Sequence, residues 1–242
     1  MGVPVLAIDT SAAVSVALVG DDGRRLAAAS ADERRRHAES LAPLITRVLN
    51  DAGTDRTELT AVVGGTGPAP FTGLRVGLVT ARTLALALGI PVRGVPSIDA
   101  LAAQAVSDLG LAPDDEVLVA SDARRKEVYW ARYRVVAHEG PHGVPVVETV
   151  AGPDVGRAAD VARAQLGESA SATRLAVVGE GAALYADVLP ADDDAPLVPD
   201  ATVLARLALA RHAAGEDLPT EPLYLRRPDI HESAPRKSPA LG

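Results

Sequence analysis

The stretch VLAIDTSAAVSVALVGDDGRRLAAAS, residues 5–30, decides the fold class. It contains three short apolar runs, Val5–Asp9, Ser15–Val19 and Leu26–Ser30, and a DDG turn signal separates the last two. Three strands joined by such short connections predict an antiparallel meander. From residue 38 onward the apolar residues change to helical spacing, which indicates a mixed α/β domain rather than an all-β one.

Helices and strands are expected to alternate after the meander. The predicted elements are a helix over Ala38–Ala52, a strand over Ala61–Val63, a helix over Thr72–Leu88 that Gly89 ends, a strand over Val92–Val95 and a helix over Ser97–Leu109. The order β-β-β-α-β-α-β-α is typical of a ribonuclease-H-like lobe, the repeating unit of the actin and sugar-kinase ATPases. This analogy concerns the fold and carries no chemistry by itself.

The second half of the chain repeats the pattern more weakly. Strands are predicted over Glu116–Ser121, Glu127–Val136 and Leu175–Gly179. Helices are predicted over Arg157–Leu166, after Gly179 through Tyr185 to Leu189, and over Thr202–Ala214. We therefore expect an α/β, actin-like (ribonuclease-H-like) two-lobe fold, with mixed sheets flanked by helices and a reduced second lobe. Residues 1–110 would form the first lobe and 111–227 the second, whose last helix (about 202–214) is a candidate to pack back on the first. Residues 228–242 are expected to be a flexible tail.

Composition excludes several classes of function. With a net charge of −8 over 242 residues, the chain alone is a poor binder of nucleic acid. One Trp, one Phe and four Tyr are too few to form a stacking surface for single strands. The absence of cysteine excludes disulfides, thiolate metal sites and a cysteine nucleophile. No apolar run approaches the ~20 residues of a transmembrane helix and no signal-peptide pattern is present, so we expect a cytoplasmic protein.

Two segments of the first lobe have the features of a nucleotide site. Asp9 ends the first strand, where actin-type ATPases carry an acidic residue that coordinates the metal on the nucleotide phosphates. The alternative is an aspartate that caps the following turn through its side chain. The loop GGTGPAPFTGLRVG, Gly64–Gly77, lies between a strand and a helix, where backbone N–H groups can hold an anion. Its spacing fits neither a Walker loop nor a dinucleotide fingerprint, so a rigid strand-to-helix turn is the alternative.

Other polar residues indicate no second chemistry. His37 precedes the first long helix and is interpreted as a surface or interface residue. The other histidines are interpreted as having no paired spacing that would suit a metal. The sequence contains no HExxH or GxSxG motif. The segment Asp122–Trp130 is predicted to be a polar hairpin, which is either a solvated turn or a contact surface near the cleft.

The two long helices of the first lobe are apolar on more than one face. A helix packed on a sheet needs only one apolar stripe. The surplus face is either covered by the second lobe or left for another chain, and the short second lobe favours a protein partner. In the helix over Thr72–Leu88, one face carries Leu74, Leu78, Ala81, Ala85 and Leu88, and the other carries Val76, Val79, Thr83, Leu86 and Ala87.

Five segments resemble those of one known family, in the same order. They are AIDTS at Ala7–Ser11, GTGPAPFTGLRVG at Gly65–Gly77, GVPSIDALA at Gly94–Ala102, SDARRKEVYWA at Ser121–Ala131 and EPLYLR at Glu221–Arg226. Each segment is weak alone, but the ordered set is similar to the bacterial TsaB (YeaZ) family. The resemblance implies an actin-like fold and pairing, through the helices of the first lobe, with a catalytic paralogue, TsaD. With the ATPase TsaE, that complex transfers a threonylcarbamoyl group from threonylcarbamoyl-AMP to the adenosine next to the anticodon of tRNAs reading codons that start with A.

Departures from the paralogue support a noncatalytic subunit. Where the paralogue reads GVNHxxGH, with two metal-binding histidines four residues apart, this chain has Ser97 and Leu101. Leucine cannot ligate a metal, and a lone serine is a poor ligand. Ala69 departs from the TsaB family itself, which usually has glycine there. If that position needs a positive φ, alanine costs ~1 kcal/mol or more.

The resemblance therefore predicts a noncatalytic scaffold that dimerises with a TsaD-like paralogue and has no catalytic residues, metal or cofactor of its own. The complex is expected to use ATP through a TsaE-like ATPase and a metal through the TsaD-like subunit. It would bind tRNA only as a complex, and the chain alone would form a homodimer, with no membrane partner. The alternatives are a free-standing actin-fold ATPase, a metal-dependent protease, or a regulatory binding protein that uses the same patch.

Two sets of site residues follow from the resemblance. The partner interface is predicted at His37, Leu41, Leu44, Ile45, Val48, Thr72, Arg75, Val76, Val79 and Thr83. A vestigial nucleotide cleft is predicted at Asp9, Thr10, Gly67, Thr72, Asp122, Arg124 and Glu127.

Overall fold

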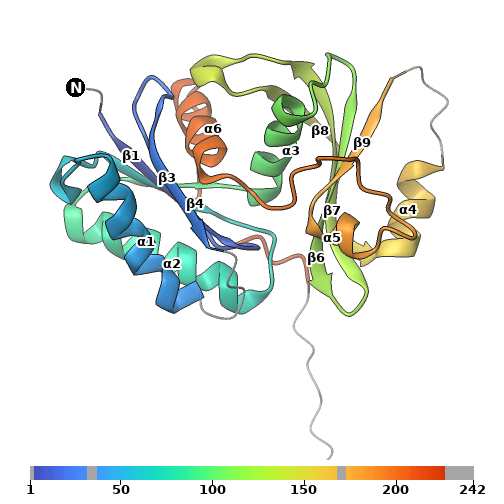
Figure 1. The fold of residues 1–242 in the computed structure, drawn as a ribbon, viewed down its shortest axis with the longest axis horizontal. Helices are drawn as coiled ribbons and strands as arrows, with labels where there is room; N and C mark the ends of the chain where they lie inside the picture. The colour runs from blue at the N-terminus through green and yellow to red at the C-terminus, as the bar shows by residue number, and fades with distance from the viewer. Residues whose placement is uncertain (1–2, 32–36, 168–172, 227–242) are drawn as a thin grey trace, which may run out of the picture.

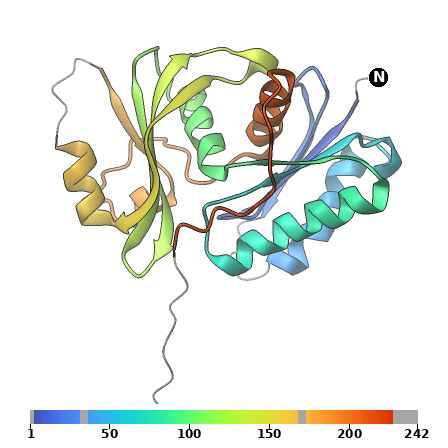
Figure 2. The same ribbon diagram turned by 180° about the vertical axis from the view of Figure 1, so that it is seen from behind.

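A computed structural model describes residues 3–31, 37–167 and 173–226, without the side chains of residues 37, 38, 71 and 72. The expected tail at 228–242 therefore lies outside the described residues. The described part has two sheets with helices on both faces of each, which is the predicted mixed α/β, actin-like fold class (Figures 1 and 2). None of its helices is long and apolar enough to cross a membrane.

The first sheet contains the predicted meander. Its strands are β1 (Val5–Asp9), β2 (Val14–Val19), β3 (Arg25–Ala31), β4 (Ala61–Gly65) and β5 (Val92–Val95), in the order β3-β2-β1-β4-β5. The pairs β1–β2 and β2–β3 are antiparallel, whereas β1–β4 and β4–β5 are parallel. Every residue of β1, β2 and β4 is buried, because helices cover both faces of these strands.

The second sheet repeats this order with one strand fewer. It contains β8 (Val146–Arg157), β7 (Glu127–Ala137), β6 (Glu116–Arg124) and β9 (Leu175–Val178), in the order β8-β7-β6-β9. Strand β6 pairs with β7 antiparallel and with β9 parallel. The sequence analysis missed β8, since this mostly exposed edge strand contains Gly152-Pro153 and lacks apolar alternation.

Helices α1 (His37–Asp51) and α2 (Phe71–Leu88) lie side by side on the outer face of the first sheet (Figure 1). Helix α2 ends before Gly89, as predicted, and the Gly89 N–H donates to the carbonyls of Ala85 and Leu86. Beyond the second sheet lie α4 (Ala158–Leu166) and α5 (Glu180–Leu184). Helix α5 follows β9, as predicted, but it ends at Leu184, because the residues from Tyr185 onward form a turn. Two short 3₁₀ helices, η1 (Arg56–Glu58) and η2 (Pro141–Gly143), lie in connections.

Two helices lie between the sheets. Helix α6 (Ala201–Ala213) packs on the first sheet with Val5, Ala7 and Ala17, and the Asp200 side chain caps it by accepting the Thr202 N–H. Helix α3 (Ser97–Asp108), although it belongs to the first half of the sequence, packs on the second sheet. Each half of the chain therefore contributes one helix that packs on the sheet of the other half.

The segment after α6 returns across the first lobe. We call residues 216–226 the strap (Figure 2). The Gly94 N–H donates to the Leu218 carbonyl at 2.9 Å, and the Leu223 N–H donates to the Thr66 carbonyl at 2.9 Å. Glycine is required at position 94, because a Cβ there would overlap the Pro219 carbonyl oxygen.

Candidate functional site

Asp9 is buried at the end of β1, with 1% of its surface exposed. Its Oδ1 accepts the backbone N–H of Ser11 at 2.8 Å and the Ser11 hydroxyl at 2.6 Å. Its Oδ2 accepts the hydroxyl of Ser97, the first residue of α3. The carboxylate therefore caps the turn after β1, and this cap is the first of its two structural roles.

The second role of Asp9 is to join three segments. Besides donating to Asp9, the Ser97 hydroxyl accepts the Gly67 N–H at 3.1 Å, and the Ser97 N–H donates to the Gly67 carbonyl at 2.7 Å. Gly65 lies so close that a Cβ there would overlap Asp9 Oδ2. The end of β1, the loop after β4 and the start of α3 thus form one closed, hydrogen-bonded junction.

Thr10 connects the same strand end to α2. Its hydroxyl donates to the Gly73 carbonyl at 2.7 Å and accepts the Gly77 N–H at 3.0 Å. Two backbone groups of α2 are therefore bonded to a buried side chain. The predicted cleft residues Asp9, Thr10 and Gly67 are together, whereas the side chain of Thr72 lies outside the described part.

The loop before α2 does not need glycine at position 69. Gly67 has a φ of +88°, but Ala69 is not among the residues with positive φ and packs against Leu74 and Leu78. Ala69 therefore does not carry the backbone strain that a positive φ would impose on alanine. The loop is a rigid strand-to-helix turn whose N–H at Gly67 is already bonded.

The other predicted cleft residues lie on the β6–β7 hairpin. Asp122 is buried and accepts the Arg124 N–H at 2.8 Å and the Arg124 guanidinium at 3.2 Å. Glu127 accepts the guanidinium of Arg226, the last residue of the strap. Burial and the charge of Asp122 raise the pKa of Tyr129 above its usual value, so this phenol stays neutral. Each acidic group of the hairpin is therefore held by an arginine.

The surplus apolar face predicted for α2 is exposed. Val79 and Leu86 have 59% and 84% of their surfaces exposed, Thr83 is exposed and Val76 is half-buried. On the opposite side of the helix, Leu74, Leu78, Ala81 and Ala85 are buried. The half-buried Ile45 lies on the neighbouring helix α1. We call Ile45, Val76, Val79, Thr83 and Leu86 the outer face.

Three predicted interface residues belong to the core instead. Leu41, Leu44 and Val48 face the first sheet and are buried with Leu6 and Ile8. Their spacing of three and four residues places them on the sheet side of α1, away from any partner on the outside. Burial in the core leaves these three side chains almost no exposed surface. The side chains of His37 and Thr72 are outside the described part.

Arg75, another predicted interface residue, contacts this chain's own strap. Its Nε donates to the Tyr224 hydroxyl at 3.0 Å, and its guanidinium lies 5.8 Å from the centre of the Tyr224 ring. Arg82, two turns further along α2, donates to the Thr220 hydroxyl at 2.9 Å and to the Thr220 carbonyl at 2.6 Å. The strap therefore borders the outer face. The EPLYLR segment was the only sequence signal for it.

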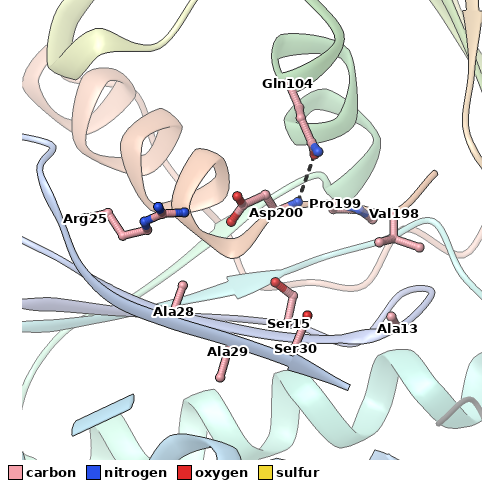
Figure 3. A pocket seen from close by; sticks show the side chains of 10 residues that line it. All are labelled: Ala13, Ser15, Arg25, Ala28, Ala29, Ser30, Gln104, Val198, Pro199 and Asp200. Carbon is pink, nitrogen blue, oxygen red and sulfur yellow. Dashed lines mark hydrogen bonds between the residues drawn. The ribbon is translucent and has the colours of Figure 1, made fainter. Parts of the chain in front are cut away.

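A cavity of about 260 Å³ lies between β2, β3, α3 and the start of α6 (Figure 3). Arg25 and Asp200 point toward each other across it. The Asp200 N–H donates to Gln104 Oε1 at 3.0 Å, and the Ala201 N–H donates to Ser15 Oγ at 3.0 Å. These bonds fix the start of α6 against α3 and β2, so the polar lining serves the joint between the lobes. None of the predicted cleft residues lines this cavity.

The chain is similar to known proteins in both sequence and structure. The family model for TsaD, tRNA N6-adenosine threonylcarbamoyltransferase, matches residues 31–218. The solved structure of YeaZ from Pseudomonas aeruginosa is similar, with a TM-score of 0.74 and 30% identity over 93% of this chain and 100% of that one. The chain belongs to the TsaB (YeaZ) family.

Sequence relatives of this TsaB-family chain differ in their coverage. The Escherichia coli protein named tRNA threonylcarbamoyladenosine biosynthesis protein TsaB is 35% identical over 130 residues, 54% of each chain. An uncharacterized Mycobacterium tuberculosis protein is 41% identical over 231 residues, which are 93% of this chain and 92% of its own. A relative from Mycobacterium leprae is also 41% identical, but this chain spans only 55% of its length.

The residues at the start of α3 do not fit a metal ion. In this TsaB-family member, the hydroxyl of Ser97 is bonded to Asp9, and Leu101 is fully buried against the second sheet. His138 and His142 are four residues apart, so the interpretation that no histidines have a paired spacing is wrong. His138 Nδ1 lies 3.1 Å from the Leu111 carbonyl. Within the described residues, no group of three or more His, Cys, Asp or Glu side chains could hold a metal ion.

Proposed function

We propose that the chain is a noncatalytic scaffold subunit that pairs with a TsaD-like paralogue in the biosynthesis of tRNA threonylcarbamoyladenosine. The paralogue would transfer the threonylcarbamoyl group from threonylcarbamoyl-AMP to the adenosine next to the anticodon. A TsaE-like ATPase would use the ATP, and the TsaD-like subunit would hold the metal. With its net charge of −8, this chain would meet tRNA only within the complex.

The outer face of α1 and α2 carries this proposal. Val79 and Leu86 are among the most exposed large apolar side chains of the described residues. Burying such side chains contributes roughly 25 cal/mol per Å² of apolar surface, so the face is a favourable place for another helix pair to pack. A related paralogue with the same fold offers such a pair, and a second copy of this chain would use the same face in its absence.

The junction around Asp9 supports a noncatalytic role. An actin-type ATPase needs the strand-end carboxylate to face a metal and its nucleotide. Here Asp9 is buried, and both of its oxygens accept hydrogen bonds from serine residues. No observation in the described part favours a free-standing ATPase or protease.

Complex formation with the cognate TsaD-like protein tests the proposal. We expect Val79→Glu to abolish the heterodimer peak on size-exclusion chromatography, because the carboxylate would be buried without a partner. The matched control is Val136→Glu, which changes a valine on β7 that is 49% exposed. Circular dichroism should show both variants folded. A Val79→Glu chain that still forms the heterodimer would overturn the proposed surface.

A further inference from the structure

The cavity in Figure 3 contains polar groups that the joint between the lobes does not use. The Ser15 hydroxyl accepts the Ala201 N–H, and its own hydrogen is left to donate. Gln104 accepts the Asp200 N–H through Oε1, so its amide NH₂ group is left over. Asp200 caps α6 through Oδ1, so Oδ2 is left over. Among the residues that the structure describes, none of these remaining groups has a hydrogen-bond partner.

Two opposite charges face the same cavity without pairing. Arg25 on β3 points toward Asp200 at the start of α6 (Figure 3). Within the described part of the chain, the Arg25 guanidinium forms neither an ion pair nor a hydrogen bond. An arginine offers five N–H donors in a fork that matches a carboxylate, whereas a carboxylate oxygen accepts from an ammonium group. The cavity therefore presents one site for an anion and one for a cation, side by side.

The rest of the cavity is small and apolar. Its volume is about 260 Å³, below the roughly 300–1,000 Å³ of pockets that hold drug-sized ligands. Ala13, Ala28, Ala29, Val198 and Pro199 line it beside the polar groups. Ser15, at its base, has only 8% of its surface exposed. A ligand that fits must be small, carry both charges close together and have at most a short side chain.

We propose that this cavity binds a small α-amino acid in its zwitterionic form. Arg25 would pair with the carboxylate of the ligand, and Asp200 would accept its ammonium group. Gln104 and Ser15 would donate to the carboxylate oxygens that Arg25 leaves open. The alanine walls would contact a short side chain. This inference goes beyond the proposed function, because the cavity includes no residue of the outer face and none of the Asp9 junction.

Amide NMR spectra of the full chain, titrated with L-alanine, L-serine and L-threonine, test the proposal. We expect saturable shifts of the Gln104 side-chain NH₂ and Ala201 N–H signals for at least one of them, with a Kd of about 1 mM or tighter. Propionate and ethylamine each carry only one of the two charges. Each should bind at least about tenfold more weakly, because one charged group of the cavity then has no partner.

Two variants remove the charges while they keep the shape of the site. Asp200→Asn retains a residue that caps helices well, and Arg25→Gln changes an exposed side chain, so both should fold. Each should raise the Kd of the amino acid at least about tenfold. Arg24→Gln is the matched control and should leave Kd unchanged, because the neighbouring Arg24 is also exposed but does not line this cavity.

Three results would overturn the inference. The first is the absence of saturable shifts with all three amino acids. The second is a Kd that is the same in the wild type, Arg25→Gln and Asp200→Asn. The third is propionate or ethylamine binding as tightly as the amino acid, which would show that the two charges do not act together.

Discussion

At the scale of single residues, Asp9 and Ser97 determine what the strand-end site can do. In an ATPase of this fold the carboxylate would be open to a metal-bound nucleotide. Here the Ser97 hydroxyl occupies one carboxylate oxygen and Ser11 the other. A buried carboxylate with such donors stabilises the fold, because an unbonded one would carry the full desolvation cost.

Ser97→Ala should therefore lower the free energy of unfolding by about 1–3 kcal/mol, because it removes a donor from a buried carboxylate. Urea denaturation measures the difference. Thr46→Ala is the control: its hydroxyl donates to the Ala42 carbonyl at 3.0 Å, but Thr46 is exposed on α1. That change should stay within about 0.5 kcal/mol. Equal effects of the two substitutions would contradict the structural role of Ser97.

At the scale of elements, one side of α2 packs on the sheet and the other side belongs to the outer face. Leu78 is buried against the sheet, whereas Leu86 is 84% exposed. We expect Leu78→Ala to cost the monomer about 2–5 kcal/mol, because it leaves a cavity in the core. Leu86→Ala should leave the stability of the monomer unchanged but weaken pairing with the partner. Urea denaturation measures the stability of the monomer, and size-exclusion chromatography measures pairing. A large loss of monomer stability in Leu86→Ala would contradict these separate roles.

Periodicity predicted most elements of the fold because buried strands and helices leave strong apolar patterns. The meander, the strands β4 and β5, and the helices α2, α3 and α6 all appear close to their expected bounds. Strand β8 has no such pattern, because its exposed edge position does not demand apolar residues. Because the strand is exposed, it also tolerates Gly152-Pro153, a pair that is typical of a loop.

The candidate site was less predictable, because spacing along α1 does not say which apolar face meets the sheet. All four apolar residues fit a helical pattern, yet Leu41, Leu44 and Val48 are buried in the core and Ile45 is half-buried at its edge. Contacts between segments that are distant along the chain leave even less of a pattern in the sequence. Nothing in the sequence around Arg75 indicates that it meets Tyr224, which lies 149 residues away.

At the scale of the whole molecule, a buried polar group joins the halves of the chain. The Tyr133 hydroxyl on β7 donates to Asp99 on α3 at 2.7 Å, and Arg211 on α6 pairs with the same carboxylate at 2.7 Å. Burial raises the pKa of Tyr133 well above its usual value; the charge of Asp99 and its hydrogen bond raise it further, and Arg211 opposes them. Asp99 on α3 therefore joins the second sheet, through the neutral phenol of Tyr133, to α6, through Arg211.

Stability should fall at alkaline pH for this reason. The pKa of Tyr133 is higher in the folded than in the unfolded chain, so its contribution is complete below about pH 10 and is lost as the pH rises through the folded pKa. Tyr133→Phe removes this titration. We expect its free energy of unfolding to decline less steeply above pH 10 than that of the wild type, and parallel declines would contradict the assignment.

The central claim is that this TsaB-family chain acts through the outer face of α1 and α2 and not through chemistry at Asp9. It is tested most directly by tRNA threonylcarbamoylation reconstituted from threonylcarbamoyl-AMP and the cognate TsaD-like and TsaE-like proteins. We predict that modification requires the chain, survives Asp9→Asn and is lost with Val79→Glu. Modification that proceeds equally well without the chain, or that survives Val79→Glu but not Asp9→Asn, would contradict the account.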